Sequence, residues 1–363
     1  MASKQPGRLG DPDMCLATDP RVHPKLRTLL HQWGVEKNTP VSTVSKDGPL
    51  EPIREIVSKA DEAQEAFYSI AELPNLERFP FPSITASDKL IPEPDGTQLR
   101  LTIRKPSAGA GDGPLPALVY FHGGGMVLGP TDSPPQNSWA EALAATGLVV
   151  VTVYFRNAYT KTGDYPFPAG LNDCATAVRW VHEHRSELGV GKLILQGESG
   201  GGNLATATAL KANKEGWVDT IDGVFAVVPY IAGAMGQSRE WKLAELPSLV
   251  ENDGYMMDMA TVALYARMYD PSGENTTNPL AWPFWASDDE LRGLPPHMIV
   301  TAELDPFRDE GNEYARKLAR ADVKVVGRTT LGMVHGAEYF VKQTLVEFFE
   351  NSVWEIKKFI DGL

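Results

Sequence analysis

Short apolar segments alternate with amphipathic segments over most of the chain. The apolar segments are typical of buried strands and lie at residues 98–105, 116–121, 148–154, 193–196, 224–228, 297–302 and 323–329. The segment after Pro168 instead carries Leu171, Cys174, Val178 and Val181 at helical spacing. Residues 148–153 are almost wholly apolar, as a parallel sheet covered on both faces requires. The pattern predicts an α/β fold with a mostly parallel central sheet and helices on both faces.

Two segments depart from this alternation. Residues 23–69 are helical in pattern, and an insert between the strands at 224–228 and 297–302 is far longer than an ordinary connection. This insert is rich in Trp, Met and Tyr and has one helical stretch at 257–269. We expect both segments to form a helical cap that excludes water from a site, the alternative being two unrelated surface additions. The predicted organisation is an N-terminal extension and cap part (1–85), a first core part (86–230), a cap insertion (231–290) and a second core part (291–363).

A sharp turn with a single serine at its apex follows the strand at 193–196. Its sequence is Gly197-Glu198-Ser199-Gly200-Gly201, and a helical pattern begins at once. This is the G-x-S-x-G nucleophile elbow, in which flanking glycines let the chain fold back tightly and expose the serine hydroxyl. The sequence leaves open whether Glu198 stabilises the turn or faces solvent.

A glycine triplet follows the strand at 116–121, in His122-Gly123-Gly124-Gly125. Backbone N–H groups in such a loop can stabilise a developing oxyanion. We expect the donors to be the N–H groups of Gly123, Gly124 and Gly200, with His122 organising the loop. The alternative reading of the triplet is a flexible surface loop, which the elbow downstream disfavours.

A general base must follow the serine if the chain order is Ser, acid, His. Only His297 and His335 come after Ser199. His297 opens a strand and therefore lies away from the carboxyl end of the sheet, where such sites are found. His335 lies in a glycine-bounded loop beyond a strand. We therefore expect His335 to be the base.

The acid is expected in the loop after the strand at 297–302. Asp305 precedes Pro306, which favours an extended backbone at the residue before it. Asp309 and Glu310 suit the first turn of the next helix, where they complement the helix dipole. Glu303 is the weaker alternative, so Asp305 is the expected acid.

The four ordered motifs together resemble the hormone-sensitive lipase family of α/β-hydrolases. They are HGGG, GESGG followed by Gly-Asn-Leu-Ala, DPFRDEG (305–311) and a final His-Gly, and the likeness extends from about residue 90 to the end. Within the family, the GESGGGN elbow and the long N-terminal extension resemble the brefeldin A esterase type. The resemblance implies an α/β-hydrolase fold with a cap and a serine carboxylesterase activity. Gly200 departs from the alanine of many members, and only its N–H is needed.

Composition and charge limit the classes of molecule that the protein is expected to bind. The 363 residues carry 34 basic and 47 acidic side chains, a net charge of −13, which argues against nucleic acid and anionic membranes. No apolar run is long enough to span a membrane, and the first residues do not resemble a secretory signal. Cys15 and Cys174 do not form a disulfide framework. We expect a cytoplasmic protein that needs no cofactor and no metal, and self-association into homo-oligomers is left open.

These features predict a carboxylic ester hydrolase with a Ser199–His335–Asp305 triad. The expected partner is a small-molecule ester of short to medium acyl length, and the resemblance adds lactones. The alternatives are a lyase or cyclase of the same fold and a ligand-binding receptor; the resemblance argues against the receptor, because the related gibberellin receptor type lacks the histidine. By proximity to the motifs, the expected pocket residues are Met126, Val127, Leu128 and Met333.

Overall fold

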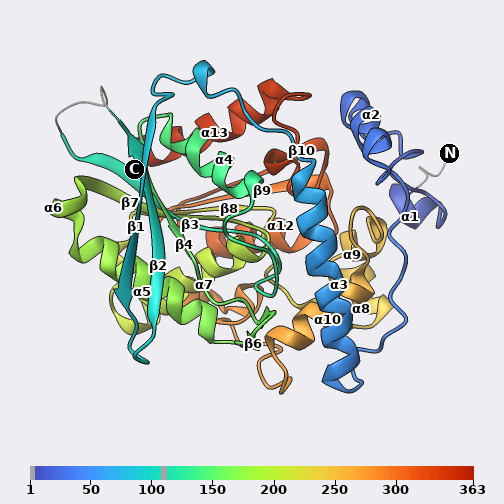
Figure 1. The fold of residues 1–363 in the computed structure, drawn as a ribbon. Coiled ribbons are helices and arrows are strands. Elements are labelled where there is room, and N and C mark those ends of the chain that lie inside the picture. The colour runs from blue at the N-terminus through green and yellow to red at the C-terminus, as the bar shows by residue number, and fades with distance from the viewer. Residues whose placement is uncertain (1–4, 108–112) are drawn as a thin grey trace.

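The computed structural model describes residues 5–107 and 113–363, and its centre is an eight-stranded sheet (Figure 1). The strand order is β1-β2-β4-β3-β7-β8-β9-β10. Pairing is parallel from β4 through β3, β7, β8 and β9 to β10, and antiparallel at β1–β2 and β2–β4. The predicted mostly parallel sheet is therefore confirmed. The bounds are β1 Ile84–Pro92, β2 Gln98–Pro106, β3 Leu115–Phe121, β4 Val149–Val153, β7 Val190–Glu198, β8 Gly223–Val227, β9 His297–Leu304 and β10 Val325–Val334, with a separate pair β5 Tyr159–Thr160 and β6 Gly163–Asp164.

Helices cover both faces of the sheet, so there are two apolar cores. Alternate side chains of β3 show this, because Val119 belongs to one core and Leu118 and Tyr120 to the other. The first face is covered by α5 Ala169–Glu183, α7 Gly200–Glu215 and α12 Arg308–Arg320, and the second by α4 Pro134–Ala144 and α13 Val346–Asp361. A short α6 Arg185–Leu188 precedes β7. The interior strands are consequently buried on both sides.

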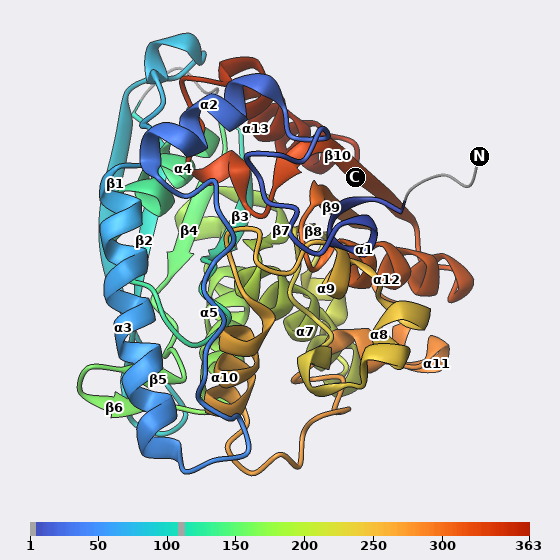
Figure 2. The same ribbon diagram turned by 90° about the vertical axis from the view of Figure 1, so that its right-hand side faces the viewer.

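The N-terminal extension and the insert between β8 and β9 lie on the same side of the molecule (Figures 1 and 2). The extension forms α1 Gly7–Gly10, α2 Pro24–Trp33 and α3 Leu50–Ser69. The insert forms α8 Arg239–Glu245, α9 Ser248–Glu251, α10 Met259–Tyr269 and α11 Asp288–Leu291. Helix α3 packs against α10, and α1 packs against α9. Segments far apart in the sequence thus pack against one another beside the sheet.

Several elements differ from the sequence prediction, and the insert forms helices α8, α9 and α11 in addition to the one helical stretch expected there. Strand β1 was not expected; it is an edge strand that pairs with β2, and most of its side chains are exposed, so it has no apolar pattern. The helical pattern at 23–69 is two helices, because Gly34 adopts a left-handed conformation (φ 71°) that ends α2.

Helix α10 depends on a buried cap, which generates a stability prediction. Asp258 Oδ1 accepts hydrogen bonds from the N–H of Thr261 (2.9 Å) and the N–H of Ser42 (3.3 Å), so it joins α10 to the N-terminal extension. Asp258→Ala should lower the free energy of unfolding by about 1–2 kcal/mol, because a helix N–H and a loop N–H both lose their acceptor. Urea denaturation checks this. Ser238→Ala, which removes the exposed cap of α8, is the matched control and should cost less. A stability of Asp258→Ala equal to that of the unmutated protein would contradict the prediction.

Candidate functional site

The motif residues gather at one edge of the sheet because each follows the carboxyl end of a parallel strand. The glycine loop follows β3, Ser199 follows β7, Asp305 follows β9 and His335 follows β10. These strands all belong to the parallel series from β3 to β10, so their carboxyl ends point to the same edge. This is where ligands bind in open α/β sheets.

Ser199 stands at a tight turn between β7 and α7. Its backbone has φ 53° and ψ −118°, a conformation that costs a non-glycine residue about 1–3 kcal/mol. The flanking glycines are required by space: a Cβ at Gly201 would lie 1.9 Å from the carbonyl oxygen of Phe121, and one at Gly197 would lie 2.3 Å from the backbone of Gly201. The turn therefore holds the serine at the apex in the manner of a nucleophile elbow.

Asp305 and His335 form a buried hydrogen-bonded pair. His335 Nδ1 donates to Asp305 Oδ2 over 2.9 Å, and Asp305 Oδ1 accepts from the N–H of Phe307 at 2.9 Å. The Asp305 side chain is fully buried, whereas the His335 side chain is 12% exposed. Because Nδ1 carries the proton, Nε2 is left as a proton acceptor. The ring of Phe307 packs edge-on against the imidazole, with centroids 5.2 Å apart, and restricts its rotation.

His297 has a different environment. It lies at the first residue of β9, is 1% exposed and donates from Nδ1 to the carbonyl oxygen of Pro295 over 2.7 Å. Burial lowers the pKa of His297 to about 4, so the ring is neutral near pH 7. The structure thus places His297 at the strand end opposite to Asp305.

His122 supports the backbone of the glycine loop. Its Nδ1 donates to the carbonyl oxygen of Gly123 over 2.6 Å, and its ring stacks on Phe155 with centroids 4.5 Å apart. Burial lowers the pKa of His122 to about 4, and the ring is therefore neutral. It is fully buried and acts on the loop backbone.

The glycine loop differs from the sequence expectation in one respect. The N–H of Gly123 donates to Glu198 Oε1 over 2.7 Å, so this donor is already bound within the protein. Among the described residues, the N–H groups of Gly124 and Gly125 have no protein acceptor. A Cβ at Gly200 would lie 2.7 Å from the nitrogen of Gly125, so this part of the loop lies against the start of α7. The sequence could not show which glycine of the triplet is bound internally.

Glu198 is fully enclosed between the elbow and the loop. Besides Gly123, its Oε1 accepts from the hydroxyl of Tyr120 over 3.1 Å. Burial raises the pKa of Glu198 from its ordinary value of 4.5 to about 8. Burial likewise lowers the pKa of nearby Lys342 to about 7; its ammonium group donates to the carbonyl oxygen of Pro135 over 2.8 Å. Glu198 therefore does not face solvent but joins two motifs.

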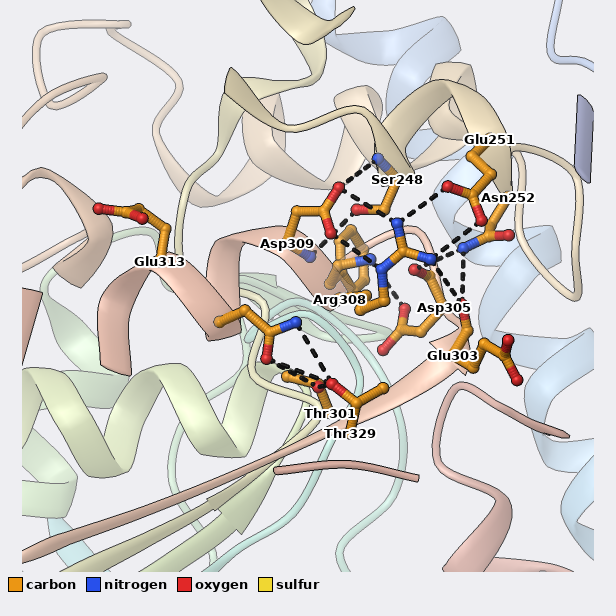
Figure 3. A network of polar contacts seen from close by, with 12 residues as sticks. Ser248, Glu251, Asn252, Thr301, Glu303, Asp305, Arg308, Asp309, Glu313 and Thr329 are labelled. Atoms are coloured by element: carbon orange, nitrogen blue, oxygen red, sulfur yellow. Dashed lines mark hydrogen bonds and ion pairs between the residues drawn. The ribbon is translucent and has the colours of Figure 1, made fainter. Parts of the chain in front are cut away.

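A polar network surrounds the loop that carries Asp305 (Figure 3). Arg308 forms two hydrogen bonds of 2.9 Å with Glu251 of α9 and contacts the carbonyl oxygen of Glu303 at 3.0 Å. The side chain of Asn252 donates to the carbonyl oxygens of Glu303 and Asp305, each at 3.1 Å. The insert between β8 and β9 thus holds the backbone on both sides of Leu304. Neither Glu251 nor Asn252 was expected from the sequence, since neither belongs to a recognisable motif.

The four expected pocket residues are buried but do not form one group. Met126, Val127 and Leu128 belong to the first core, whereas Met333 belongs to the second. Two aromatic residues also lie beside the glycine loop: a Cβ at Gly125 would lie 3.5 Å from Tyr265 and 3.8 Å from Tyr230. The ring of Tyr230 also stacks on Phe307, with centroids 4.7 Å apart. These aromatic residues had no periodic or motif signal in the sequence.

Residues 5–107 and 113–363 contain neither a cluster suited to a metal ion nor a helix suited to crossing a membrane. No group of three His, Cys, Asp or Glu side chains there is arranged to hold a metal ion. Over the same residues, every helix falls short of the length and apolar character that crossing a membrane requires.

Comparisons with known proteins agree with this fold. A family model described as alpha/beta hydrolase fold matches residues 118–338. The solved structure titled brefeldin A esterase, a bacterial homologue of human hormone sensitive lipase, has a TM-score of 0.95 and 43% identity and covers 98% of both chains. The structure of esterase Est22 has a TM-score of 0.82 and 31% identity, covering 96% of this chain and 99% of that chain.

A curated relative gives the same result over a shorter range. Esterase LipI of Mycobacterium tuberculosis is 35% identical over 225 residues, which are 61% of this chain and 65% of LipI. This chain therefore spans slightly less than two thirds of that relative. The match to brefeldin A esterase extends over nearly the whole chain, N-terminal extension included. The chain belongs to the α/β-hydrolase fold family, in the hormone-sensitive lipase group to which brefeldin A esterase also belongs.

Proposed function

We propose that this protein is a serine carboxylesterase whose catalytic residues are Ser199, His335 and Asp305. The observation that carries the proposal is the 2.9 Å hydrogen bond between His335 Nδ1 and buried Asp305, at the sheet edge that also bears the Ser199 elbow. The naming of its relatives as esterases supports the same activity. A lyase that uses Ser199 and His335 for proton transfer needs no acyl-enzyme and no oxyanion hole, and a receptor needs no base.

The geometry supports a two-step acyl transfer. His335 Nε2 removes the Ser199 hydroxyl proton as Oγ attacks the acyl carbon, and Asp305 stabilises the imidazolium that forms. Collapse of the tetrahedral intermediate breaks the bond to the alkoxy oxygen, which takes the proton from His335 and leaves as the alcohol. Water then attacks the acyl-enzyme with His335 again as base, which releases the acid and restores Ser199.

For the oxyanion hole we assign the N–H groups of Gly124, Gly125 and Gly200, which replaces the expectation for Gly123. Gly123 is unsuited because its N–H donates to Glu198. The N–H of Gly200 is the first of α7 and has no partner within the helix. Gly125 lies against Gly200, so the two donors can converge on one oxygen.

The substrate class follows from what surrounds the loop. Tyr230 and Tyr265 next to Gly125 are buried or half-buried aromatics, which suit an uncharged acyl group. Helices α3 and α10, which pack together, are assigned as a cap over the site. We propose uncharged esters of short to medium acyl length, with lactones included because the same attack opens a cyclic ester.

A p-nitrophenyl ester series from acetate to palmitate tests the activity. Turnover should be highest at short to medium chains, because the proposed cap over the site leaves little room for long ones. Ser199→Ala should lower kcat by about 10⁴-fold or more, since the nucleophile is lost. Turnover that is highest with palmitate would contradict the pocket, and turnover that persists in Ser199→Ala would contradict the nucleophile. A folded protein with no serine-dependent turnover would favour the lyase or receptor alternatives.

Substitution of each of the two histidines that follow Ser199 gives a test with its own control. His335→Ala should lower kcat by about 10⁴-fold, because the base and its hydrogen bond to Asp305 are lost. His297→Ala should leave kcat near that of the unmutated protein, since its ring bonds to Pro295 at the other end of the strand. Steady-state kinetics and thermal unfolding of both variants check this. An active His335→Ala beside an inactive but folded His297→Ala would reverse the assignment.

The raised pKa of Glu198 predicts that the stability of the protein depends on pH. Its pKa is near 8 in the folded protein and lower when unfolded, so its contribution to stability is complete below about pH 4.5 and is lost as pH rises through about 8. The glutamine of Glu198→Gln cannot ionise, so the variant does not lose this stability as pH rises. Lys342 is still present in the variant. The variant should therefore gain stability relative to the unmutated protein between pH 5 and pH 9, as roughly bounded by these pKa values. Urea denaturation at several pH values measures the difference, with exposed Glu187→Gln as the control. A difference independent of pH would show that Glu198 is ionised throughout.

A further inference from the structure

An N-terminal arm, residues 19–23, reaches the loops that carry Asp305 and His335. Arg21 is the centre of this arm: its guanidinium group pairs with Asp19 at 2.7 Å and with Glu251. Its side chain is 16% exposed, and that of Asp19 is 1% exposed. Asp19 is further held by the hydroxyl of Tyr255 at 2.8 Å. Burial alone would raise the pKa of Asp19, but the hydrogen bonds from Arg21 and Tyr255 outweigh it and lower the pKa, so the ion pair persists.

The arm is connected to Asp305 through one buried amide. Arg21 Nη2 donates to Asn252 Oδ1 over 3.2 Å. Asn252, fully buried, uses its Nδ2 to donate to the carbonyl oxygens of Glu303 and Asp305 at 3.1 Å each. Since Arg21 can only donate, its contact defines which end of the Asn252 amide is the oxygen. The NH₂ end is thereby directed at the backbone of the acid.

Glu251 supports the same loop with charge. Its carboxylate, 4% exposed, accepts from Arg21 and, through two bonds of 2.9 Å, from Arg308 (Figure 3). Arg308 in turn donates to the carbonyl oxygen of Glu303. Because Arg21 and Arg308 both pair with the buried carboxylate of Glu251, both side chains are held in place. The N-terminal arm and the loop that carries Asp305 are thereby joined.

The arm also contacts the end of the strand that leads to the base. The N–H of His23 donates to the carbonyl oxygen of Gly332 in β10 over 3.0 Å, and the N–H of Gly332 donates to Glu303 Oε2 over 2.8 Å. Gly332 has φ 73°, and a Cβ there would lie 3.2 Å from the carbonyl oxygen of Arg21. Strand β10 ends at Val334, directly before His335.

From these contacts we propose that Asn252, oriented by Arg21 of the N-terminal arm, is a positioning residue that sets the Asp305 carboxylate against His335. The inference rests on the triad assigned above. Asn252 does not touch the reacting atoms and acts only through the backbone at 303–305. The N-terminal arm is accordingly part of the catalytic support and not only a covering segment.

Asn252→Asp tests this with almost no change in shape. A carboxylate cannot donate to the carbonyl oxygens of Glu303 and Asp305, so the loop should shift. Misplacement of about 1 Å costs up to about 10²-fold in rate, so we expect kcat to fall by about 10- to 100-fold while KM changes little. Arg21→Met, which leaves Asn252 in place, should lower kcat in the same direction by a smaller factor. Arg185→Met is the matched control, because Arg185 of α6 pairs with Asp222 just before β8, at the end of the parallel strands opposite to the site.

Hydrogen exchange supplies a readout that does not depend on activity. In Asn252→Asp and Arg21→Met, exchange should increase in peptides that cover residues 303–309 and 331–336, and it should not increase there in Arg185→Met. Unchanged exchange in these peptides, or an equal increase over the whole chain with kcat unaltered, would overturn the inference. Absence of ester turnover in the unmutated protein would overturn the proposed function instead, and the exchange result would still decide the role of Asn252.

Discussion

The close approach of two backbones, at the end of β3 and the start of α7, is the constraint on which the site depends. The carbonyl oxygen of Phe121 occupies the space that a side chain at Gly201 would need. The same contact continues from Gly125 to Gly200, where added atoms would again overlap the loop. No side chains separate the end of the strand from the start of the helix. The backbone of the glycine loop is therefore in direct contact with the backbone next to Ser199. Backbone donors in such a position need no reorganisation when charge develops.

Buried glutamate side chains fix the loops around this contact. Glu198 binds the N–H of Gly123 after β3, and Glu310 of α12 binds the N–H groups of Ile231 and Ala232 after β8. Burial raises the pKa of both Glu198 and Glu310 to about 8. A buried acceptor without a donor would be costly, and these carboxyl groups meet backbone donors that the loops leave unpaired. The carboxyl end of the sheet is thus ordered by side chains that do not take part in the proposed chemistry.

The sequence predicted the sheet well because its interior strands are apolar on both faces, as β4 shows. It also singled out Asp305 and His335, which the structure joins, since chain order and strand ends left few candidates. It missed β1, whose side chains are mostly exposed at the sheet edge. It could not assign a partner to Glu198 or a role to Asn252, because their contacts lie far away in the sequence. Which N–H of a glycine triplet is free depends on a carboxylate 75 residues away.

The contacts of the N-terminal arm have a consequence for synthesis and folding. Arg21 and Glu251 are separated by 230 residues, and His23 pairs with Gly332 near the other end of the chain. Contacts of such high sequence separation form late, because the intervening chain must be ordered first. A nascent chain that has already exposed Ser199 still lacks Asn252, Asp305 and His335. The proposed site can therefore assemble only after residue 335 has been synthesised, when the contacts of the N-terminal arm can form as well.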